Sequence, residues 1–451
     1  MNKWSVHVEN FGKIKEADIE VAPLTFFLGD NNSGKSYIMT LIYGLLNLRL
    51  HFGQYYLCTN IEEYARCASF LKSKLNELEI GEQHNFVLGK EEMHNFEVLL
   101  NSILKENLDK FISELFNKSI SIDALSVHFL ENNRFEFLLR NPMDNKDFVT
   151  IQCYKENREF RPGYGTLMNQ RTNDEKILFF ICYILESLLQ RDFSNNDKEN
   201  VMYLPTARTG FLLTYKSIVG QAMYDKFNIQ SQEKNLLTRP TGDFLSVLSS
   251  MMVNKEKDDF WDIIDFIQRE MLCGKISVAN LPAHDIFYQP DNSEKSLPMY
   301  LSSGVVTELT PIVMLLKYCD IKTLLIEEPE ISLHPELQWK MAKLLIRLAN
   351  YGVPVFATTH SDLIIQHVNN MLKLSKVREK KEDIKVSGYE EIDLISTEQV
   401  NVYQFNTTGE NQTEIQKIIC SDYGFETVTF YNTLKQLSNE IDEIEGYMEE
   451  E

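Results

Sequence analysis

Short continuous apolar runs, followed by stretches of helical periodicity, recur along the chain. Residues 24–28, 323–326 and 353–357 are such runs, and runs of this length are typical of strands buried on both faces of a sheet. After the first run, apolar residues at positions 38, 41, 42, 45 and 46 recur with the spacing of one helix face. This pattern predicts an α/β fold in which buried strands alternate with helices.

The segments between these runs have a different pattern. Residues 61–118 are predicted to form helices with charged outer faces, and residues 174–193 a strongly apolar helix that further helices follow. The alternation in residues 124–141 predicts a β-hairpin that turns at residues 131–133, and residues 148–154 add a strand to it. The chain therefore inserts helices and an antiparallel β part between the runs that form the main sheet.

The turn after the first run has the composition of a phosphate-binding loop. Gly29-x-x-x-x-Gly34-Lys35-Ser36 lies between a predicted strand and a predicted helix, where backbone N–H groups can wrap the β-phosphate of a nucleotide. Lys35 would reach the β- and γ-phosphate oxygens, and Ser36 would offer its hydroxyl to Mg²⁺. ATP and Mg²⁺ are therefore the expected cofactors. The residues predicted to hold the nucleotide here are Gly29, Asn31, Asn32, Ser33, Gly34, Lys35, Ser36 and Tyr37.

Two carboxylates and a histidine follow the other apolar runs. Glu327 and Glu328 end the second run; we expect Glu327 to hold Mg²⁺ directly or through water, and Glu328 to take a proton from an attacking water. His360 lies just beyond the third run, at the edge where open α/β sheets bind ligands. A neutral imidazole there could hold the γ-phosphate or position the water, so Glu328 and His360 are the predicted catalytic residues.

A second anion site is predicted far from the first. The stretch YLSSG (residues 300–304) places Ser302, Ser303 and Gly304 immediately before an apolar helix start, and a helix N-terminus of this composition can bind an anion. One nucleotide does not require two such loops from one chain.

Composition and charge limit the remaining possibilities. The net charge of −21 argues against a surface that binds nucleic acid through bulk charge. Seven scattered cysteines form no C-x-x-C pair, and the chain opens without an apolar signal region, so we expect a reducing cytoplasm and no membrane span. Basic residues gather between positions 373 and 385 among acidic ones; a solvated loop is the favoured interpretation, and a nucleic-acid patch is the alternative.

Together these motifs resemble an AAA-family ATPase of the ATP-binding-cassette class, in the branch that includes the structural-maintenance-of-chromosomes (SMC) heads. The opening HVENFGKIKEADIEVAPLTFFLGDNNSGKS is similar to the N-terminal hairpin and P-loop of that branch, and YLSSG, LLIEEPE and TTH resemble its signature loop, Walker B strand and switch histidine. The resemblance implies that the signature loop of one subunit contacts the ATP held by another. It also implies a head with a mixed sheet, a P-loop core, an antiparallel β part and helical insertions.

Departures from that class point to a narrower group. Glu327 stands where aspartate is commoner, and His334 follows in a segment where transport ATPases carry aspartate. The form EEPEISLHPE is similar to the overcoming-lysogenization-defect (OLD) nucleases and related bacterial defence ATPases, as is YLPTARTGF, which makes Arg208 a candidate phosphate or intersubunit contact. Gln152 is the only candidate that we found for the glutamine of a Q-loop. Those nucleases carry a metal-binding Toprim domain after the head, whereas no D-x-D follows His360 here.

The leading functional hypothesis is the ATPase subunit of an anti-phage system similar to Septu or PARIS. Such a subunit would assemble as a dimer or a higher oligomer such as a hexamer, regulate a separately encoded HNH or Toprim effector nuclease, and meet DNA through that complex. It would not itself be a nuclease. The alternative is a RecF-like repair or recombination ATPase that binds DNA directly, and a transporter subunit is disfavoured.

The domain organisation follows from these assignments. The acidic C-terminus has apolar residues spaced as a narrow helical seam, Phe430, Leu434, Leu437, Ile441, Ile444 and Met448; docking to a partner and packing on the chain's own head are both open, and docking is slightly favoured. The expected units are the N-terminal head with P-loop (1–52), a helical insertion (53–120), the β-hairpin part (121–170), a second helical insertion (171–272), the C-terminal head (273–425) and the acidic helix (426–451).

Overall fold

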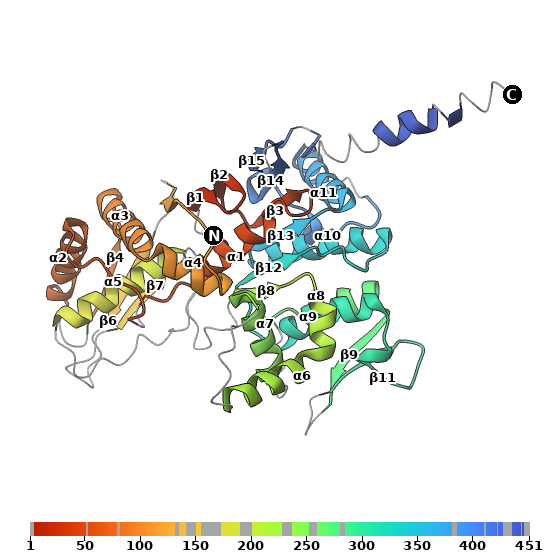
Figure 1. Cartoon of the computed structure of the whole chain (residues 1–451), viewed down its shortest axis with the longest axis horizontal. Helices are drawn as coiled ribbons and strands as arrows, with labels where there is room; N and C mark the ends of the chain where they lie inside the picture. The colour runs from red at the N-terminus through yellow and green to blue at the C-terminus, as the bar shows by residue number, and fades with distance from the viewer. Residues whose placement is uncertain are drawn as a thin grey trace.

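The protein is described by a computed structural model in which a nine-stranded mixed sheet forms the centre (Figure 1). The described residues are 4–50, 53–78, 82–130, 135–140, 150–154, 173–189, 201–227, 237–251, 259–279, 285–380, 386–409, 412–421, 423–426, 435–442 and 444–445. The strand order in the sheet is β5-β1-β2-β15-β14-β3-β13-β12-β8.

One half of this sheet is parallel and carries the three apolar runs. The strand β3 lies between β13 and β14 and is parallel to both, and β12 is parallel to β13 and to β8. The first two runs form strands as predicted, and the third begins and ends two residues later than expected, so that His360 still follows it directly. The strands of this half are β3 (Leu24–Gly29), β8 (Val201–Leu204), β12 (Thr323–Glu327), β13 (Val355–Thr359) and β14 (Val400–Thr407).

The other half is antiparallel except where β2 pairs in parallel with β15, and it begins with the hairpin of β1 and β2. On one side β1 pairs with β5, and on the other side β2 pairs with β15, which returns antiparallel to β14. A mixed sheet with a P-loop core and an antiparallel part is the predicted fold class, and the structure confirms it. These strands are β1 (Trp4–Phe11), β2 (Ile14–Glu20), β5 (Ala124–Phe129) and β15 (Thr413–Ile418).

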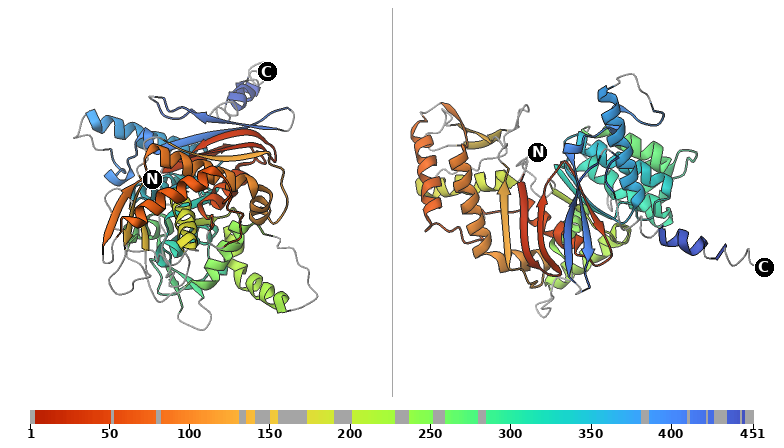
Figure 2. Two further views of the ribbon diagram at one scale, coloured as in Figure 1. Left: turned by 90° about the vertical axis from the view of Figure 1, so that its left-hand side faces the viewer. Right: turned by 90° about the horizontal axis from the view of Figure 1, so that it is seen from above.

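Alternate residues of the parallel strands enter two separate cores. In β3, Phe26 belongs to one cluster and Phe27 to the other, and Ile326 and Leu325 of β12 divide in the same way. Side chains on opposite faces of a sheet alternate along each strand, so the two cores cover the two faces. One core takes residues from α1, α3, α4 and α5, and the other from α6 to α11, and Figure 2 shows the helices of residues 62–189 and the pair α10–α11 at opposite ends of the molecule.

The helices have the following bounds. In chain order they are α1 (Lys35–Leu46), α2 (Glu62–Asn76), α3 (Lys90–Glu106), α4 (Leu108–Phe116), α5 (Asn173–Leu189), α6 (Arg208–Phe227), α7 (Arg239–Ser250), α8 (Trp261–Phe266), η2 (Ile267–Leu272), η3 (Met299–Leu301), α9 (Gly304–Tyr318), α10 (Pro335–Asn350), α11 (Asp362–Lys380), η4 (Glu391–Asp393) and η5 (Thr397–Gln399). None of the helices that the structure describes is long and apolar enough to cross a bilayer.

A small three-stranded sheet corrects the sequence-based picture. The hairpin predicted in residues 124–141 is wrong: its first strand, β5, pairs with β1, while its second, β6 (Glu136–Arg140), joins β4 (Gln83–Val87) and β7 (Thr150–Tyr154) in a separate sheet. The strand β4 lies within residues 53–120, which were expected to form a helical insertion, and residues 131–133 lie outside the described part. Alternation identifies a strand but not its partner, because pairing is decided by distant segments.

The second predicted helical segment also contains a strand. β8 lies within residues 171–272 and closes one edge of the main sheet against β12. It brings the residues that follow it, including Arg208, to the end of the strand that carries Glu327. The remaining small sheet consists of β9 (Gly274–Val278), β10 (Ile286–Pro290) and β11 (Leu297–Pro298).

Candidate ATP-binding and hydrolysis site

The predicted phosphate loop connects the end of β3 to the start of α1. Gly29, Asn32 and Gly34 have φ values of 138°, 62° and 96°, a region that glycine and asparagine tolerate better than other residues. A Cβ on Gly29 would lie 2.3 Å from the backbone oxygen of Phe405. The loop therefore requires glycine here both for its conformation and for its approach to β14.

Lys35 is the buried cation of this loop. Its Nζ donates hydrogen bonds to the backbone oxygens of Gly29 (2.9 Å) and Asp30 (2.7 Å) and to Ser33 Oγ (3.4 Å). Burial lowers the pKa of Lys35 to about 8, and nearby carboxylates, of which Glu328 contributes most, oppose this shift. The lysine is thus placed between the loop and the carboxylates at the end of β12.

Other predicted loop residues face solvent. Asn31, Asn32, Ser36 and Tyr37 are exposed, whereas Ser33 is buried. The ring of Tyr37 packs against Phe11 and Phe116, with centroid distances of 5.6 and 5.3 Å. The hydroxyl of Ser36 is therefore accessible to a ligand, and Tyr37 is held at the edge of the loop by its aromatic neighbours.

Glu327 has one oxygen held and one free at the end of β12. Oε2 accepts hydrogen bonds from the backbone N–H (3.2 Å) and the hydroxyl (3.0 Å) of Thr206. Oε1 is buried and accepts no hydrogen bond from the described residues. Hard cations such as Mg²⁺ prefer oxygen ligands, and an oriented carboxylate with a spare buried oxygen fits that requirement. Ser36 and Glu327 are the residues that would hold the ion.

Glu328 adopts an unusual backbone conformation. Its φ is 44°, which is rare for a residue with a side chain and costs energy. Its backbone N–H donates to the backbone oxygen (2.9 Å) and Oγ1 (3.2 Å) of Thr358, and its backbone oxygen accepts from Arg208 Nη2 (3.1 Å). Burial, followed by the charge of Glu327, raises the pKa of its carboxyl, as suits a group that must accept a proton.

His360 lies directly after β13 and close to Glu328. Its Nε2 is 3.9 Å from Glu328 Oε1, and about a third of each side chain is exposed. Burial, and then the charge of Lys35, lowers the pKa of the imidazole, so it is neutral near pH 7 and can both accept and donate hydrogen bonds. The structure thus brings Lys35, Glu327, Glu328 and His360 to one edge of the sheet, as the sequence predicted.

Glu330 is a further site residue that the sequence analysis missed. Its Oε1 accepts a hydrogen bond of 2.6 Å from the backbone N–H of His360, and burial raises the pKa of its carboxyl. It joins the loop after β12 to the end of β13 and so fixes the backbone of His360. An acidic residue two positions beyond a predicted catalytic glutamate is the signal that could have found it.

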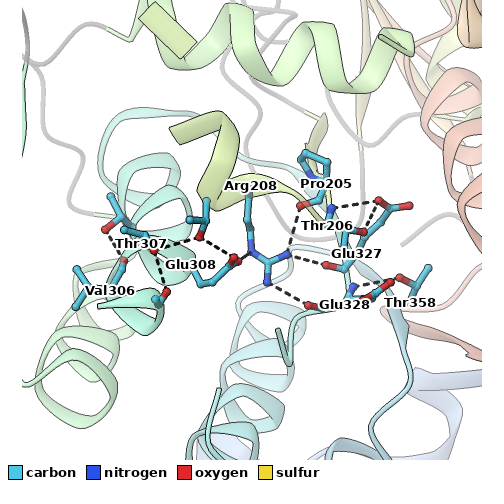
Figure 3. A network of polar contacts seen from close by, with 12 residues as sticks. Pro205, Thr206, Arg208, Val306, Thr307, Glu308, Glu327, Glu328 and Thr358 are labelled. Atoms are coloured by element: carbon cyan, nitrogen blue, oxygen red, sulfur yellow. Dashed lines mark hydrogen bonds and ion pairs between the residues drawn. The ribbon is translucent and has the colours of Figure 1, made fainter. Parts of the chain in front are cut away.

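The structure also places three residues that the sequence analysis singled out, Arg208, His334 and Gln152. Arg208 was expected to contact phosphate or a partner, but its side chain is only 1% exposed and forms an ion pair with Glu308 at 2.7 Å (Figure 3). His334 caps α10, with Nδ1 accepting from the N–H of Glu336 at 3.5 Å. Gln152 lies on β7, in a small sheet outside the nine-stranded one.

The second anion loop occupies the N-terminus of α9. Ser303 is the N-cap residue and its Oγ accepts from the N–H of Val306 at 3.4 Å, which leaves the other first-turn N–H groups directed outward. Ser303 and Gly304 are exposed. The preceding Tyr300 and Leu301 are 73% and 62% exposed. Among the described hydrogen bonds, none joins Ser302, Ser303 or Gly304 to the phosphate loop of the same chain.

The arrangement suits hydrolysis of a phosphoanhydride. It offers a phosphate loop with a cation, a carboxylate with a free buried oxygen, a second carboxylate of raised pKa and a neutral imidazole. Phosphoryl transfer depends mainly on positioning and on charge stabilisation of this kind.

Three solved structures are similar to the chain: the SMC head domain from Thermotoga maritima (12% identity, 93% of this chain and 100% of that chain, TM-score 0.35), an SMC head bound to the C-terminal winged-helix domain of ScpA (11%, 93% and 98%, 0.38), and a Pyrococcus furiosus SMC head with an extended coiled coil bound to the C-terminal domain of ScpA (11%, 98% and 99%, 0.37). TM-scores in this range are too low to support an inference about activity or partners.

Sequence comparisons give a clearer answer. Curated proteins gave no match to the chain. The family described as the AAA ATPase domain matches residues 1–365, which include the phosphate loop, the signature loop, both carboxylates and His360. The chain therefore belongs to the AAA ATPase domain family.

Proposed function

We propose that the protein hydrolyses ATP in a site that two copies of the chain complete together. The observation that carries this proposal is the position of the signature loop. Ser303 and Gly304 lie at an exposed helix N-terminus, and two exposed apolar residues, Tyr300 and Leu301, precede them in the sequence. Among the described residues, they form no hydrogen bond to the phosphate loop of their own chain. A second copy would cover the apolar side chains and present the helix N-terminus to the bound γ-phosphate.

Within such a site each residue has a separate task. Ser36 and Glu327 would hold Mg²⁺, which would neutralise charge on the phosphate oxygens. Lys35 and the backbone of the phosphate loop bind the β- and γ-phosphates. Glu328 accepts the proton of the attacking water, and the neutral imidazole of His360 orients the water or the γ-phosphate.

We further propose that the protein is the ATPase subunit of an anti-phage complex and controls a separately encoded effector nuclease of HNH or Toprim type. The resemblance of EEPEISLHPE to defence ATPases supports this assignment. Oligomers such as dimers or hexamers are expected, and DNA would be met through the complex.

The alternative, a RecF-like ATPase that binds DNA by itself, has less support. Of the basic stretch at residues 373–385, Arg378 forms an ion pair with Glu391, and Lys376 donates to the backbone oxygen of Ser421. These contacts favour the interpretation of that stretch as a structural and solvated surface. Lys381 and Lys385 lie outside the described residues.

Glu328→Gln tests the proposed chemistry. The amide cannot accept the proton of water, so turnover should fall by about 10²–10⁴-fold while ATP affinity is retained. Glu336→Gln is the matched control, because Glu336 is an exposed carboxylate in the first turn of α10 and its loss should leave turnover unchanged. Turnover by Glu328→Gln equal to that of the control would exclude Glu328 as the base.

The biological role requires an assay in cells. Cells that carry this chain with an adjacent nuclease gene should form fewer phage plaques than cells with either gene alone, and Glu328→Gln should change that protection. DNA binding by the purified chain at physiological salt, without the nuclease, would favour the repair alternative. Full protection by the nuclease alone would contradict regulation by this chain.

A further inference from the structure

Arg208 occupies the centre of a buried polar network between two parts of the head. It begins α6, directly after the loop that follows β8. Its Nη1 donates to the backbone oxygens of Glu327 (2.7 Å) and Pro205 (3.4 Å), and its Nη2 to that of Glu328 (3.1 Å). Figure 3 shows the planar guanidinium directed at these oxygens on one side and at Glu308 on the other.

The contacts on the first side hold the catalytic glutamate in place. Thr358 binds the backbone N–H of Glu328, and Arg208 binds its backbone oxygen. A residue with positive φ keeps that conformation only where its surroundings hold it firmly. With both of its peptide groups fixed, the Glu328 side chain is held toward Lys35 and His360.

The contacts on the second side reach the signature helix. Glu308 lies on the first turns of α9, and its Oε2 is 2.7 Å from Arg208 Nε. Glu308 Oε1 accepts from the hydroxyl of Thr209 at 2.6 Å, and the oxygen of that hydroxyl lies 3.1 Å from Thr307 Oγ1. The start of α9 also lies against the loop after Glu328, where a Cβ on Gly304 would be 3.5 Å from Ser332 Cβ. Two contacts therefore connect α9 to the end of β12.

We propose that Arg208 is a positioning residue that couples the signature helix α9 to the catalytic end of β12 in the same chain. The proposal rests on the two-chain site proposed above. In that site α9 contacts the nucleotide held by the partner, whereas β12 acts on the nucleotide held by its own chain. When the partner's ATP contacts α9, the ion pair of Glu308 and Arg208 transmits the resulting change in the position of the helix to Glu328. Each nucleotide would then influence the hydrolysis of the other.

The first test replaces Arg208 by lysine. Arg208→Lys keeps the charge opposite Glu308, but one ammonium lacks the planar fork that reaches Glu308 and two carbonyl oxygens together. We expect the Kd of a fluorescent ATP analogue to stay within about twofold and turnover to fall by about 10²-fold, the effect of misplacing a catalytic group by about 1 Å.

Arg347→Lys is the matched control for this variant. Arg347 is also buried and paired, with Asp393 at 2.7 Å, but lies on α10 away from Glu328. An equal loss of turnover in both variants would show a merely structural role and overturn the proposal, as would wild-type turnover by Arg208→Lys. If Arg208→Lys does not fold, the double variant Arg208→Met/Glu308→Leu removes the pair without leaving a buried charge and should show the same loss.

The second test isolates the coupling to α9 with mixed chains. In one composite site, a Ser303→Arg chain supplies the phosphate loop and the Walker B strand. A Lys35→Ala chain supplies the signature helix of that same site. Adding Arg208→Lys to the Lys35→Ala chain should lower turnover at that site by about fivefold or more. Unchanged turnover would show that Arg208 acts only on β12 of its own chain, and this would overturn the coupling. No turnover in the unmodified mixture would instead overturn the two-chain site, and an inactive wild type would overturn the ATPase proposal itself.

Discussion

Lys35 illustrates how a single side chain can make nucleotide binding depend on pH. Burial lowers its pKa to about 8, although Glu328, Asp30, Glu330 and Glu327 favour the charged form. Phosphate groups bound beside it would favour the ammonium further and raise this pKa. ATP binding above the free pKa therefore requires uptake of a proton.

We predict that ATP affinity falls as the pH rises through the free pKa of Lys35. Below about pH 7 the ammonium is charged in both the free and the bound protein, so protonation of Lys35 adds no pH dependence. Between about pH 8 and 10 the affinity should fall by up to about tenfold per pH unit. Titrations of a fluorescent ATP analogue across this range measure the effect, and Lys35→Ala should bind weakly with no such slope. A flat profile for the wild type would contradict the depressed pKa.

At the scale of elements, the N-terminus of α9 and the end of β3 are two predicted anion sites with different neighbours. The phosphate loop is backed by β14, where Gly29 approaches Phe405, and is close to the carboxylates. The start of α9 is exposed and is preceded by exposed apolar side chains. The two elements therefore serve different nucleotides in the proposed assembly.

Mixing two inactive variants tests this division. Lys35→Ala removes a charge-assisted contact from the phosphate loop, and Ser303→Arg blocks the N-terminus of α9 with a bulky cation. Each pure variant should be inactive, but a mixed dimer contains one site with an intact loop and an intact signature, so part of the turnover should return. Native mass spectrometry establishes that mixed dimers form. If they form and turnover stays absent, the signature does not act on the partner.

At the scale of the whole molecule, the acidic C-terminal helix stands apart from the head. Residues 435–442 are helical and exposed, and Figures 1 and 2 show them projecting from the rest of the chain. Leu437, Ile441 and Ile444 of the predicted seam are 51%, 45% and 61% exposed; the other seam residues lie outside the described part. This arrangement favours docking over packing on the chain's own head, and the acidic residues call for a partner surface that is basic and apolar.

Deletion of residues 438–451 should abolish co-purification of the neighbouring nuclease while folding and ATP binding are retained. The deleted residues contribute no buried side chain among those described, so thermal unfolding should be unchanged. Replacement of Leu437 and Ile441 by serine provides a milder variant with the same expected loss of the partner. A truncated chain that is insoluble would indicate packing on the head, and one that still binds the nuclease would contradict docking.

The sequence by itself determined the local elements that carry chemistry. The phosphate loop, the strands that end at Glu327 and Thr359, and the helices after them follow from apolar runs, glycines and caps that act over a few residues. These signals are strong because a buried strand or a glycine turn restricts nearly every position within it. The residues Lys35, Glu327, Glu328 and His360 were therefore predicted correctly to meet at one edge of the sheet.

Only the tertiary structure decided which strands pair and which buried polar groups meet. β5 and β6 have the alternation of a hairpin yet enter different sheets, and β8 has only four residues, too few for periodicity to mark it. Arg208 was predicted to contact phosphate or a partner subunit because YLPTARTGF resembles a segment of the OLD nucleases and related ATPases. Its partner, Glu308, lies 100 positions later in the chain, and no local pattern connects them. Pairing across such separations is determined by the packing of the complete core, because it depends on burial that the sequence alone does not display.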